Sequence, residues 1–210
     1  MNTMITAHSG AQGTPANSPE YLRLSLGMDC EALEIDIRPV DGVLRLTHDM
    51  PKGCEAPPLE LCLDMLARDG RRLLNCDMKT VGSVEDVLAM AGARGLCRRL
   101  IFTGDEITAR EQRAISDAGA QWWMNVQPDM LTQPGRAVSL LRERGAEWIN
   151  FNYRYASPEL MAELRAAGIR ISVWTVDDEE AQRRLLELGV DNMTTRHVAR
   201  VLELRAQMRR

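Results

Sequence analysis

The strongest constraint on the fold of this chain is a regular alternation of strand-like and helix-like segments along its 210 residues. The strand-like segments are short apolar or alternating runs, and the helix-like segments repeat leucine, alanine and methionine at helical spacing. Eight predicted strands cover residues 4–8, 33–37, 73–79, 99–104, 122–126, 148–153, 170–176 and 191–195. Eight predicted helices, most of which close on a glycine suited to a left-handed C-cap, cover residues 18–27, 58–70, 83–95, 108–119, 134–145, 157–168, 178–189 and 197–208.

Eight strand-helix units predict a closed barrel of parallel strands. The expected fold class is therefore α/β, a single-domain (β/α)8 TIM barrel over residues 1–210. An open doubly wound sheet is the alternative, but the segment after the first strand, "HSGAQGTPANS", lacks the Gly-rich phosphate loop of that fold. Only "DMPKGCEAPP" separates His48 from Leu59, so the insertion after the second strand is very short.

Charge and cysteine content argue against several classes of function. The net charge of −4 arises from interspersed acids and bases, so there is no basic stripe for a nucleic acid. The sequence has no apolar run suited to membrane insertion and no secretory leader, so a cytoplasmic location is expected. The sequence does not indicate an oligomeric state. The cysteines lack CxxC spacing, which predicts free thiols rather than disulfides or a zinc site: Cys30, Cys54, Cys62, Cys76 and Cys97.

The second predicted strand carries a charged side chain at every second position, in "LEIDIRPVDGVLRLTHD". Side chains two apart on a strand share a face, so Glu34, Asp36 and Arg38 lie opposite the apolar face of the same strand. Both faces of a barrel strand are covered, and the charged face is therefore expected inside the barrel. The next strand repeats the pattern with Asp77 and Lys79.

Two interpretations of these interior charges remain open. Glu34, Asp36 and Asp77 offer the oxygen ligands that suit one hard divalent cation, Mg²⁺ or Ca²⁺, and would repel one another without it. In the alternative interpretation, Arg38 and Lys79 neutralise the acids in a layer of salt bridges without a metal.

Two of the three histidines are predicted at the C-terminal mouth, where barrel active sites lie. His8 ends the first strand, and His48 ends a strand that folds back after the Asp41-Gly42 turn. A strict two-residue turn would place His48 on the face opposite Glu34, whereas a bulged three-residue turn would bring it across from Glu34. Imidazoles beside a metal suit general acid and base chemistry at phosphorus. The third, His197, reads as a helix-start residue.

In this order the residues resemble the glycerophosphodiester phosphodiesterases, a family of metal-dependent barrels, over nearly the whole chain. The family opens with His-Arg-Gly and Pro-Glu-Asn-Thr, continues with Glu-x-Asp, Asp-Gly and His-Asp, and then has a strand with Glu-x-Lys. "VWTVDDEEAQRRLLELGVDNMTT" is similar to the Trp-Thr strand and Gly-Val-Asp segment near the family's end. The corresponding positions here are His8–Gly10, Pro15–Ser18, Glu34 and Asp36, Asp41 and Gly42, His48 and Asp49, and Asp77 and Lys79.

The resemblance implies a hydrolase that cleaves small glycerophosphodiesters, such as glycerophosphocholine or glycerophosphoethanolamine, to glycerol 3-phosphate and an alcohol. It implies that Glu34, Asp36 and Asp77 bind one divalent cation. This cation would bind the phosphate and lower the pKa of the substrate hydroxyl beside it. His8 and His48 would act as base and acid, and Lys79 would offset charge on the phosphoryl oxygens. Trp174 would line the mouth, although a large aromatic on a barrel strand also fits plain core packing.

The chain departs from the family pattern at three positions. Ser9 replaces an arginine that would contact phosphate, Ala16 replaces a glutamate, and Asp77 replaces a longer carboxylate. If the arginine and glutamate pair in the family, losing both leaves no unpaired charge, but phosphate binding would be weaker. Arg38 and Arg154 are the candidates to compensate by binding substrate, with an exposed salt bridge as the alternative role of each.

Two other functions remain as alternatives to hydrolysis. One is a non-catalytic or divergent barrel that binds a phosphorylated ligand without turnover. The other is a phosphosugar isomerase or aldolase-like barrel that relies on Lys79 rather than on a metal. Metal-dependent cleavage, binding without cleavage, and activity that survives chelation distinguish the three.

Overall fold

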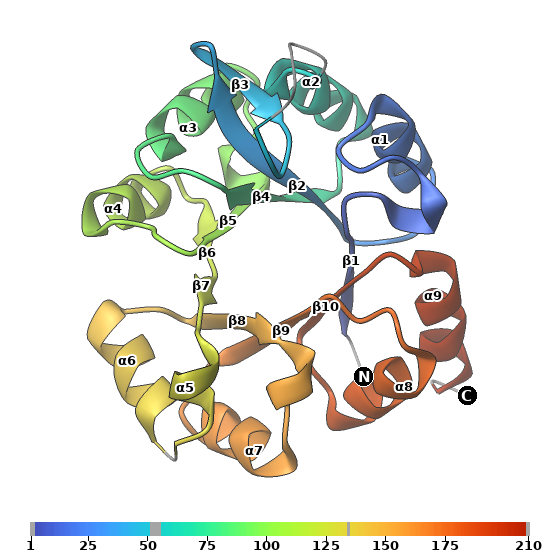
Figure 1. The fold of residues 1–210 in the computed structure, drawn as a ribbon, viewed down its shortest axis with the longest axis vertical. Coiled ribbons are helices and arrows are strands. Elements are labelled where there is room, and N and C mark those ends of the chain that lie inside the picture. Colours follow the sequence, from blue (N-terminus) through green and yellow to red (C-terminus); the bar gives the residue numbers. More distant parts are fainter. Residues whose placement is uncertain (1–2, 51–55, 134, 209–210) are drawn as a thin grey trace.

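Parallel strands form a central ring with helices around it, as the computed structural model shows (Figure 1). The structure describes residues 3–50, 56–133 and 135–208. The strand order is β6-β5-β4-β2-β1-β10-β9-β8-β7, and β3 pairs only with β2. The two ends of this order, β6 and β7, are separated in the chain by Trp123 alone, whose N–H donates to Phe102 O of β5 at 3.0 Å. The parallel barrel is therefore nearly closed, as the sequence predicts.

The strands are β1 (Met4–Ala7), β2 (Ala32–Val40), β3 (Val43–Leu46), β4 (Leu73–Met78), β5 (Leu100–Gly104), β6 (Gln121–Trp122), β7 (Met124–Asn125), β8 (Trp148–Asn152), β9 (Arg170–Trp174) and β10 (Asn192–Thr195). The helices are α1 (Pro19–Leu26), α2 (Leu59–Asp69), α3 (Val84–Gly92), α4 (Ala109–Asp117), α5 (Pro128–Leu131), α6 (Arg136–Arg144), α7 (Pro158–Ala166), α8 (Glu179–Leu188) and α9 (Val198–Gln207). Short 3-10 turns lie at Ala11–Gly13, Cys97–Arg99 and Tyr153–Tyr155.

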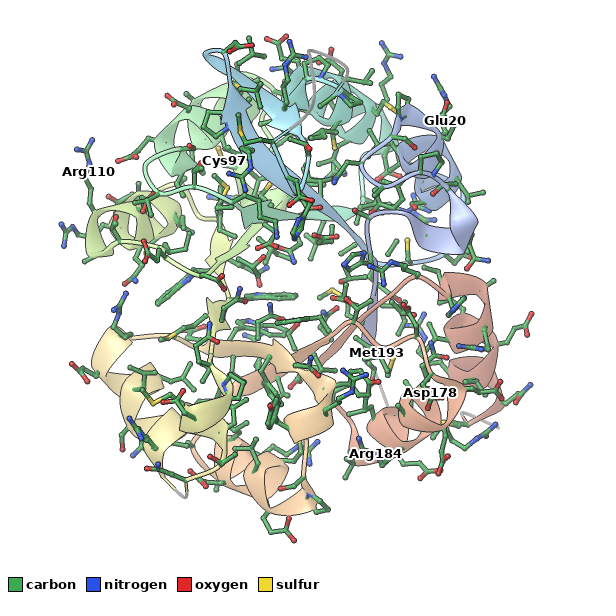
Figure 2. The ribbon with its side chains drawn as sticks, in the orientation of Figure 1. Glu20, Cys97, Arg110, Asp178, Arg184 and Met193 are labelled. Atoms are coloured by element: carbon green, nitrogen blue, oxygen red, sulfur yellow. The ribbon has the colours of Figure 1, made fainter. Side chains whose placement is uncertain are left out.

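The helices begin where the sequence supplies capping groups. The Ser18, Ser157 and Asp178 side chains each accept a backbone N–H bond in the first turn of α1, α7 and α8. Their outer faces carry charged side chains, as Glu20 of α1 and Arg110 of α4 illustrate by pointing away from the barrel (Figure 2). The inner faces bury leucine, valine and isoleucine against the strands.

The two faces of β2 are divided as predicted. Leu33, Ile35 and Ile37 are almost fully buried in the apolar layer between strands and helices. Glu34 and Asp36 face the barrel interior, and the parallel register places Asp36 beside Asp77 of β4. The prediction of an inward charged face is therefore confirmed.

The barrel interior changes character along the strands. At the N-terminal ends, Trp123 stacks on Trp148 with ring centroids 4.3 Å apart, and Ile101 packs beside them. Toward the C-terminal ends, neutral polar side chains follow, linked by hydrogen bonds of 2.7–2.9 Å in the order Thr6, Asn192, Ser172, Asn150 and Asn125. The apolar floor closes one end, and charged groups lie at the other.

The structure refines four sequence expectations. The predicted strand 122–126 is divided into β6 and β7, and the turn α5 precedes α6. The turn between β2 and β3 is the strict two-residue form, since Val40 pairs with Val43 and both Asp41 and Gly42 have positive φ. Four cysteines in the described ranges are free thiols, while Cys54 lies outside those ranges.

Candidate active site

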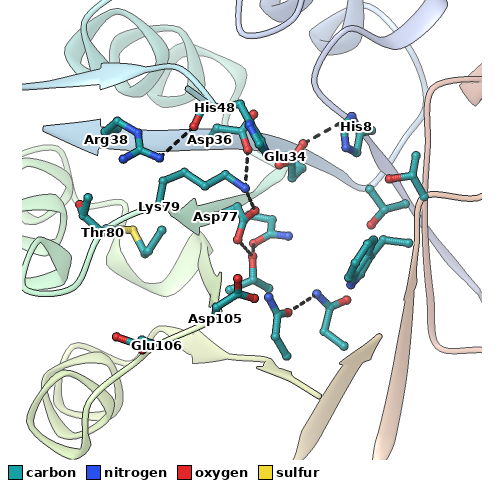
Figure 3. A pocket seen from close by; sticks show the side chains of 18 of the residues that line it. His8, Glu34, Asp36, Arg38, His48, Asp77, Lys79, Thr80, Asp105 and Glu106 are labelled. Atoms are coloured by element: carbon teal, nitrogen blue, oxygen red, sulfur yellow. Dashed lines mark hydrogen bonds and ion pairs between the residues drawn. The ribbon is translucent and has the colours of Figure 1, made fainter. Parts of the chain in front are cut away.

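Eight of the predicted site residues line one cavity of about 600 Å³ at the C-terminal ends of the strands. Figure 3 shows most of them converging from β2, from β4 and from the segments that follow β1, β3 and β4. This is the end at which barrel enzymes build their active sites. The predicted residues found here are His8, Glu34, Asp36, Arg38, His48, Asp77, Lys79 and Trp174.

Three carboxylates form the centre of the cavity. Glu34, Asp36 and Asp77 each offer one oxygen, and these oxygens all lie within 4.8 Å of one another. Glu34 and Asp36 are buried, with 5% and 4% of their surface exposed, and Asp77 is half-buried. Oxygen ligands at this spacing, with Glu34 Oε1 making no hydrogen bond among the described residues, fit a hard divalent cation. The cluster could therefore hold a metal ion.

Lys79 lies directly against this cluster. Its ammonium Nζ is 3.0 Å from Asp36 Oδ1 and 2.5 Å from Asp77 Oδ2 (Figure 3). Burial lowers the pKa of Lys79, but the two carboxylates outweigh it and raise that pKa above its usual value, so the amine stays protonated. The salt-bridge interpretation is thus correct for Lys79, which pairs with two of the three acids. The same position would also let the ammonium face a bound phosphate.

The protonation states of the acids differ because their surroundings differ. Burial, with the nearby charges of Asp36 and Asp77, raises the pKa of Glu34 well above its usual value. Burial would also raise the pKa of Asp36, but the Lys79 charge and a hydrogen bond from Asn17 bring that pKa below its usual value. A bound cation would favour the ionised form of Glu34.

Each carboxylate also accepts a hydrogen bond from a neutral group. The Ser9 N–H donates to Glu34 Oε2 at 2.9 Å, Asn17 Nδ2 to Asp36 Oδ2 at 2.8 Å, and the Thr103 hydroxyl to Asp77 Oδ1 at 3.1 Å. Asn17 and Thr103 were not predicted from the sequence as contributors to the site. Asn17 falls in the "PANS" segment matched to a family motif, and Thr103 follows the period-two pattern of β5.

His8 follows β1 and is partly buried beside Glu34. Its Nδ1 lies 2.8 Å from Ser9 O and 3.9 Å from Glu34 Oε2. Because a carbonyl oxygen can only accept, Nδ1 carries the proton and Nε2 of the neutral ring is the proton acceptor. Burial lowers the pKa of His8 below its usual value, so the ring is neutral at pH 7. This state suits a general base.

His48 reaches the cavity by leaving the strand ladder. Extending the β2–β3 register beyond Leu46 would set His48 opposite Ile35, whose side chain faces the helices. Instead β3 ends at Leu46, and the Thr47 hydroxyl donates to Asp49 O at 2.7 Å in a tight turn. The exposed His48 ring then lies 3.0 Å from the Asp49 carboxylate and lines the cavity. Strand alternation alone could not place it.

The two arginines proposed for substrate binding have different positions. Arg38 lines the cavity and donates from Nη2 to His48 O at 3.1 Å. Arg154 instead stacks over the Tyr153 ring, 5.4 Å from its centroid, and is absent from the cavity lining. Within the described residues neither forms an ion pair, so the salt-bridge alternative is wrong for both, and Arg38 does not neutralise the acids.

Trp174 and the Ser9 segment complete the cavity wall and its support. Trp174 is 37% exposed and lines the mouth, so plain core packing does not describe it. Ser9 is 2% exposed, with its hydroxyl 3.4 Å from Asp36 Oδ2.

His197 begins α9, as predicted, and is exposed. Asp105 and Glu106, in the loop after β5, also line the cavity, and their loop position gave no sequence signal.

Most of the sequence matches a known family. A model of the glycerophosphoryl diester phosphodiesterase family matches residues 63–200. The chain belongs to this family. The family name denotes phosphoric diester hydrolases, and the match confirms the resemblance inferred from the motifs.

Individual family members are similar to this chain in sequence or in fold. A glycerophosphodiester phosphodiesterase of Arabidopsis thaliana, GDPD4, is 28% identical over an alignment of 146 residues, and the match covers 66% of this chain and 43% of that protein. The chain thus corresponds to less than half the length of this curated relative.

No helix in the described ranges is both long and apolar enough to cross a bilayer.

Solved structures from the family share the fold. A putative family member from Agrobacterium tumefaciens superposes with a TM-score of 0.86 at 20% identity, covering 100% of this chain and 99% of its own. One from Silicibacter pomeroyi gives 0.84 at 19% identity, covering 98% and 94%. An Oleispira antarctica phosphodiesterase, solved in complex with the product sn-glycerol-3-phosphate, gives 0.77 at 18% identity, covering 96% of each chain. At these identities the likeness establishes the barrel.

Proposed function

We propose that this protein is a metal-dependent phosphodiesterase that cleaves small glycerophosphodiesters to glycerol 3-phosphate and an alcohol. The observation that carries the proposal is that Lys79, two histidines and the acidic cluster, which consists of Glu34, Asp36 and Asp77, converge in one cavity. Family membership and the product named for the Oleispira antarctica protein support the substrate class. Residues 1–210 are proposed to act as one catalytic domain, and a cytoplasmic location stays a prediction.

In this proposal the acidic cluster holds one divalent cation, Mg²⁺ or Ca²⁺. When bound, the cation would neutralise charge on the phosphate and lower the pKa of a nearby hydroxyl. Lys79 donates to the phosphoryl oxygens from its place beside Asp36 and Asp77. Arg38 and Trp174, at the cavity mouth, contact the outer part of the substrate.

The two histidines move the protons. Nε2 of neutral His8 takes the proton from the substrate hydroxyl next to the phosphate, and that oxygen attacks phosphorus. His48, protonated and supported by the Asp49 carboxylate, gives a proton to the departing alcohol oxygen. Attack by a neighbouring hydroxyl closes a cyclic ester, which water opens to glycerol 3-phosphate with the proton roles exchanged.

Lys79 argues against the aldolase-like alternative. A Schiff-base lysine must be a neutral amine when it attacks a carbonyl. The carboxylates of Asp36 and Asp77 hold Lys79 as an ammonium. Binding of a phosphorylated ligand without turnover remains the second candidate, because Ser9 lacks the guanidinium that would contact phosphate.

A chelation assay tests the proposal. The purified protein is stripped with EDTA, and cleavage of bis(p-nitrophenyl) phosphate and release of glycerol 3-phosphate from glycerophosphocholine and glycerophosphoethanolamine are measured with and without Mg²⁺, Ca²⁺ or Mn²⁺. We expect turnover only with added cation and a melting temperature that rises with cation concentration. Cation-independent turnover would contradict the metal role, and ligand binding without cleavage would favour the non-catalytic alternative.

A matched pair of variants separates the site from the fold. Asp77→Asn should abolish cation-dependent turnover by removing one anionic ligand. Asp64→Asn, on the outer surface of α2, should keep wild-type turnover. Equal activity in both variants would show that the cluster is not the site of chemistry.

A further inference from the structure

We propose that Asn17 and Thr103 are positioning residues of the acidic cluster, each fixing the carboxylate oxygen that is turned away from Lys79. This inference rests on the cation site of the proposed function. It adds two residues that bind neither cation nor substrate and act through Asp36 and Asp77.

Asn17 is bound to Asp36 from two sides. Its Nδ2 donates to Asp36 Oδ2 at 2.8 Å, and its Oδ1 accepts from the Asp36 backbone N–H at 3.0 Å. Asn17 is buried, with 4% of its surface exposed. Its backbone has φ 56°, in the left-handed region where asparagine is better tolerated than most side chains. A buried residue with both amide atoms bonded to Asp36 is placed to fix the orientation of that carboxylate.

Thr103 contacts Asp77 from the neighbouring strand β5. It projects inward from β5, one strand beyond Asp77, and is 2% exposed. Its single hydroxyl proton is shared between Asp77 Oδ1, at 3.1 Å, and Asn75 Oδ1, at 3.0 Å, both of which are acceptors. Two separate elements thus supply a donor to two different carboxylates.

The bonds leave one oxygen of each carboxylate for the cavity. Asp36 Oδ2 accepts a hydrogen bond from Asn17, whereas Asp36 Oδ1 forms an ion pair with Lys79 Nζ at 3.0 Å. Asp77 Oδ1 accepts a hydrogen bond from the Thr103 hydroxyl, whereas Asp77 Oδ2 forms an ion pair with Lys79 Nζ at 2.5 Å. Lys79 marks the cavity side, where a cation or a phosphate would lie. The neutral donors occupy the opposite side in both cases.

Neutral donors suit this task better than charged ones. A hydrogen bond from an amide or a hydroxyl fixes the rotation of a carboxylate without cancelling the negative charge that attracts a cation. An arginine in the same place would orient the carboxylate but oppose a cation. Losing such an outer partner weakens metal binding by roughly 10–100-fold in known metal sites.

Substitutions that remove each donor test the proposal. Asn17→Gly removes the amide and tolerates the positive φ, and Thr103→Val removes the hydroxyl with little change in volume. Thr103→Ser restores a hydroxyl and serves as the rescue. Thr14→Ala is the control for Asn17, because Thr14 donates to Ala11 O in the same loop without touching a carboxylate. The dissociation constant for Mn²⁺ is measured by calorimetry on the full chain, and folding is checked by urea unfolding in EDTA.

The expected result is a dissociation constant roughly 10–100-fold higher in Asn17→Gly and Thr103→Val, with wild-type values in Thr103→Ser and Thr14→Ala. Wild-type binding by the folded Asn17→Gly and Thr103→Val proteins would overturn the inference while leaving the proposed function intact. Equal weakening in Thr14→Ala and Asn17→Gly would overturn the role of Asn17, and failure of Thr103→Ser to rescue would overturn that of Thr103. If Asn17→Gly does not fold, the Thr103 pair decides. Absence of Mn²⁺ binding by the wild-type protein would contradict the proposed cation site and this inference together.

Discussion

At the scale of single residues, the cavity holds an ammonium where a cation is also proposed to bind. Lys79 contacts Asp36 and Asp77, and the pKa of Lys79 lies above its usual value because of them. The ammonium therefore compensates the acids in the absence of other positive charge. A divalent cation must bind next to it, and like charges at such short range repel.

Replacing Lys79 by methionine should separate these two effects. We expect Lys79→Met to bind Mn²⁺ about tenfold more tightly, because the repulsion is removed. Its melting temperature in EDTA should fall, because Asp36 and Asp77 lose their positively charged partner. Turnover should also fall, because the phosphoryl oxygens lose a donor. Calorimetry, thermal melting and the glycerol 3-phosphate assay measure the three effects, and weaker Mn²⁺ binding in the variant would show that Lys79 assists the cation.

His48 offers a second test at this scale. Its side chain is 65% exposed, so His48→Ala should leave the free energy of unfolding nearly unchanged. Loss of a general acid should lower kcat by roughly a hundredfold or more. His197→Ala is the matched control, since His197 is exposed, begins α9 and is absent from the cavity lining. Equal turnover in the two variants would remove His48 from the mechanism.

The site was predictable to the extent that it follows strand alternation. Glu34, Asp36 and Asp77 share an inward face because side chains two apart on a strand point the same way. The hydrogen bond from Asn17 was not predictable, because it spans 19 residues and depends on how the loop before α1 returns to β2. The position of His48 depends on where β3 ends, which no period in the sequence encodes.

At the scale of elements, the strand-helix alternation predicted the barrel because each unit has a strong local pattern. The two features that the sequence did not predict, α5 and the break between β6 and β7, are too short to show a helical or strand period of apolar residues. The four residues of α5 make about one helical turn, and the break between β6 and β7 falls inside five consecutive residues of mostly apolar character. The break follows from the Trp123 ring, which is fully buried against Trp148 in the barrel floor.

The start of α4 stabilises a segment of the cavity wall. Glu111 is 2% exposed and completes a capping box, accepting from Thr108 N and Oγ1 at 2.8 and 2.7 Å. It also accepts from the Gly82 N–H at 2.8 Å, next to Thr80 and Val81 of the cavity lining. One carboxylate therefore joins the helix to the loop after β4.

Glu111→Ala should lower the free energy of unfolding by about 1–3 kcal/mol, because the cap is lost and buried donors are left unpaired. Arg113→Ala, at an exposed position of the same helix, is the control and should change it by less than about 0.5 kcal/mol. Urea unfolding of both variants in EDTA measures the difference. Equal stabilities would mean that the capping box contributes nothing measurable.

At the scale of the whole molecule, the two ends of the barrel have separate tasks. The C-terminal end gathers the acids and histidines of the cavity, whereas the N-terminal end carries a structural ion network far from it. In that network Asp69, at the end of α2, contacts the guanidinium groups of Arg72 and Arg99, and accepts from the backbone of Arg71 and Arg72. The Asp69 side chain is 7% exposed and that of Arg72 is 5% exposed. This network should set part of the pH dependence of stability independently of the cation.

The direction of that dependence follows from the pKa of Asp69. Burial would raise this pKa, but the hydrogen bonds from Arg72 and Arg71 and the charge of Arg72 bring it below the ordinary value of 3.8. A carboxyl whose pKa is lower in the folded state stabilises the fold above its unfolded pKa, and the contribution disappears as the pH falls through the folded value. Asp69→Asn should therefore be about 3 kcal/mol less stable than the wild-type protein at pH 7. The gap should narrow steadily below about pH 4. Asp64→Asn removes an acid whose pair with Arg94 is half exposed, so its gap should stay below about 1 kcal/mol throughout. Urea unfolding in EDTA from pH 7 to pH 3 measures both gaps, and a gap for Asp69→Asn that does not change with pH would show that the charge of Asp69 does not stabilise this end of the barrel.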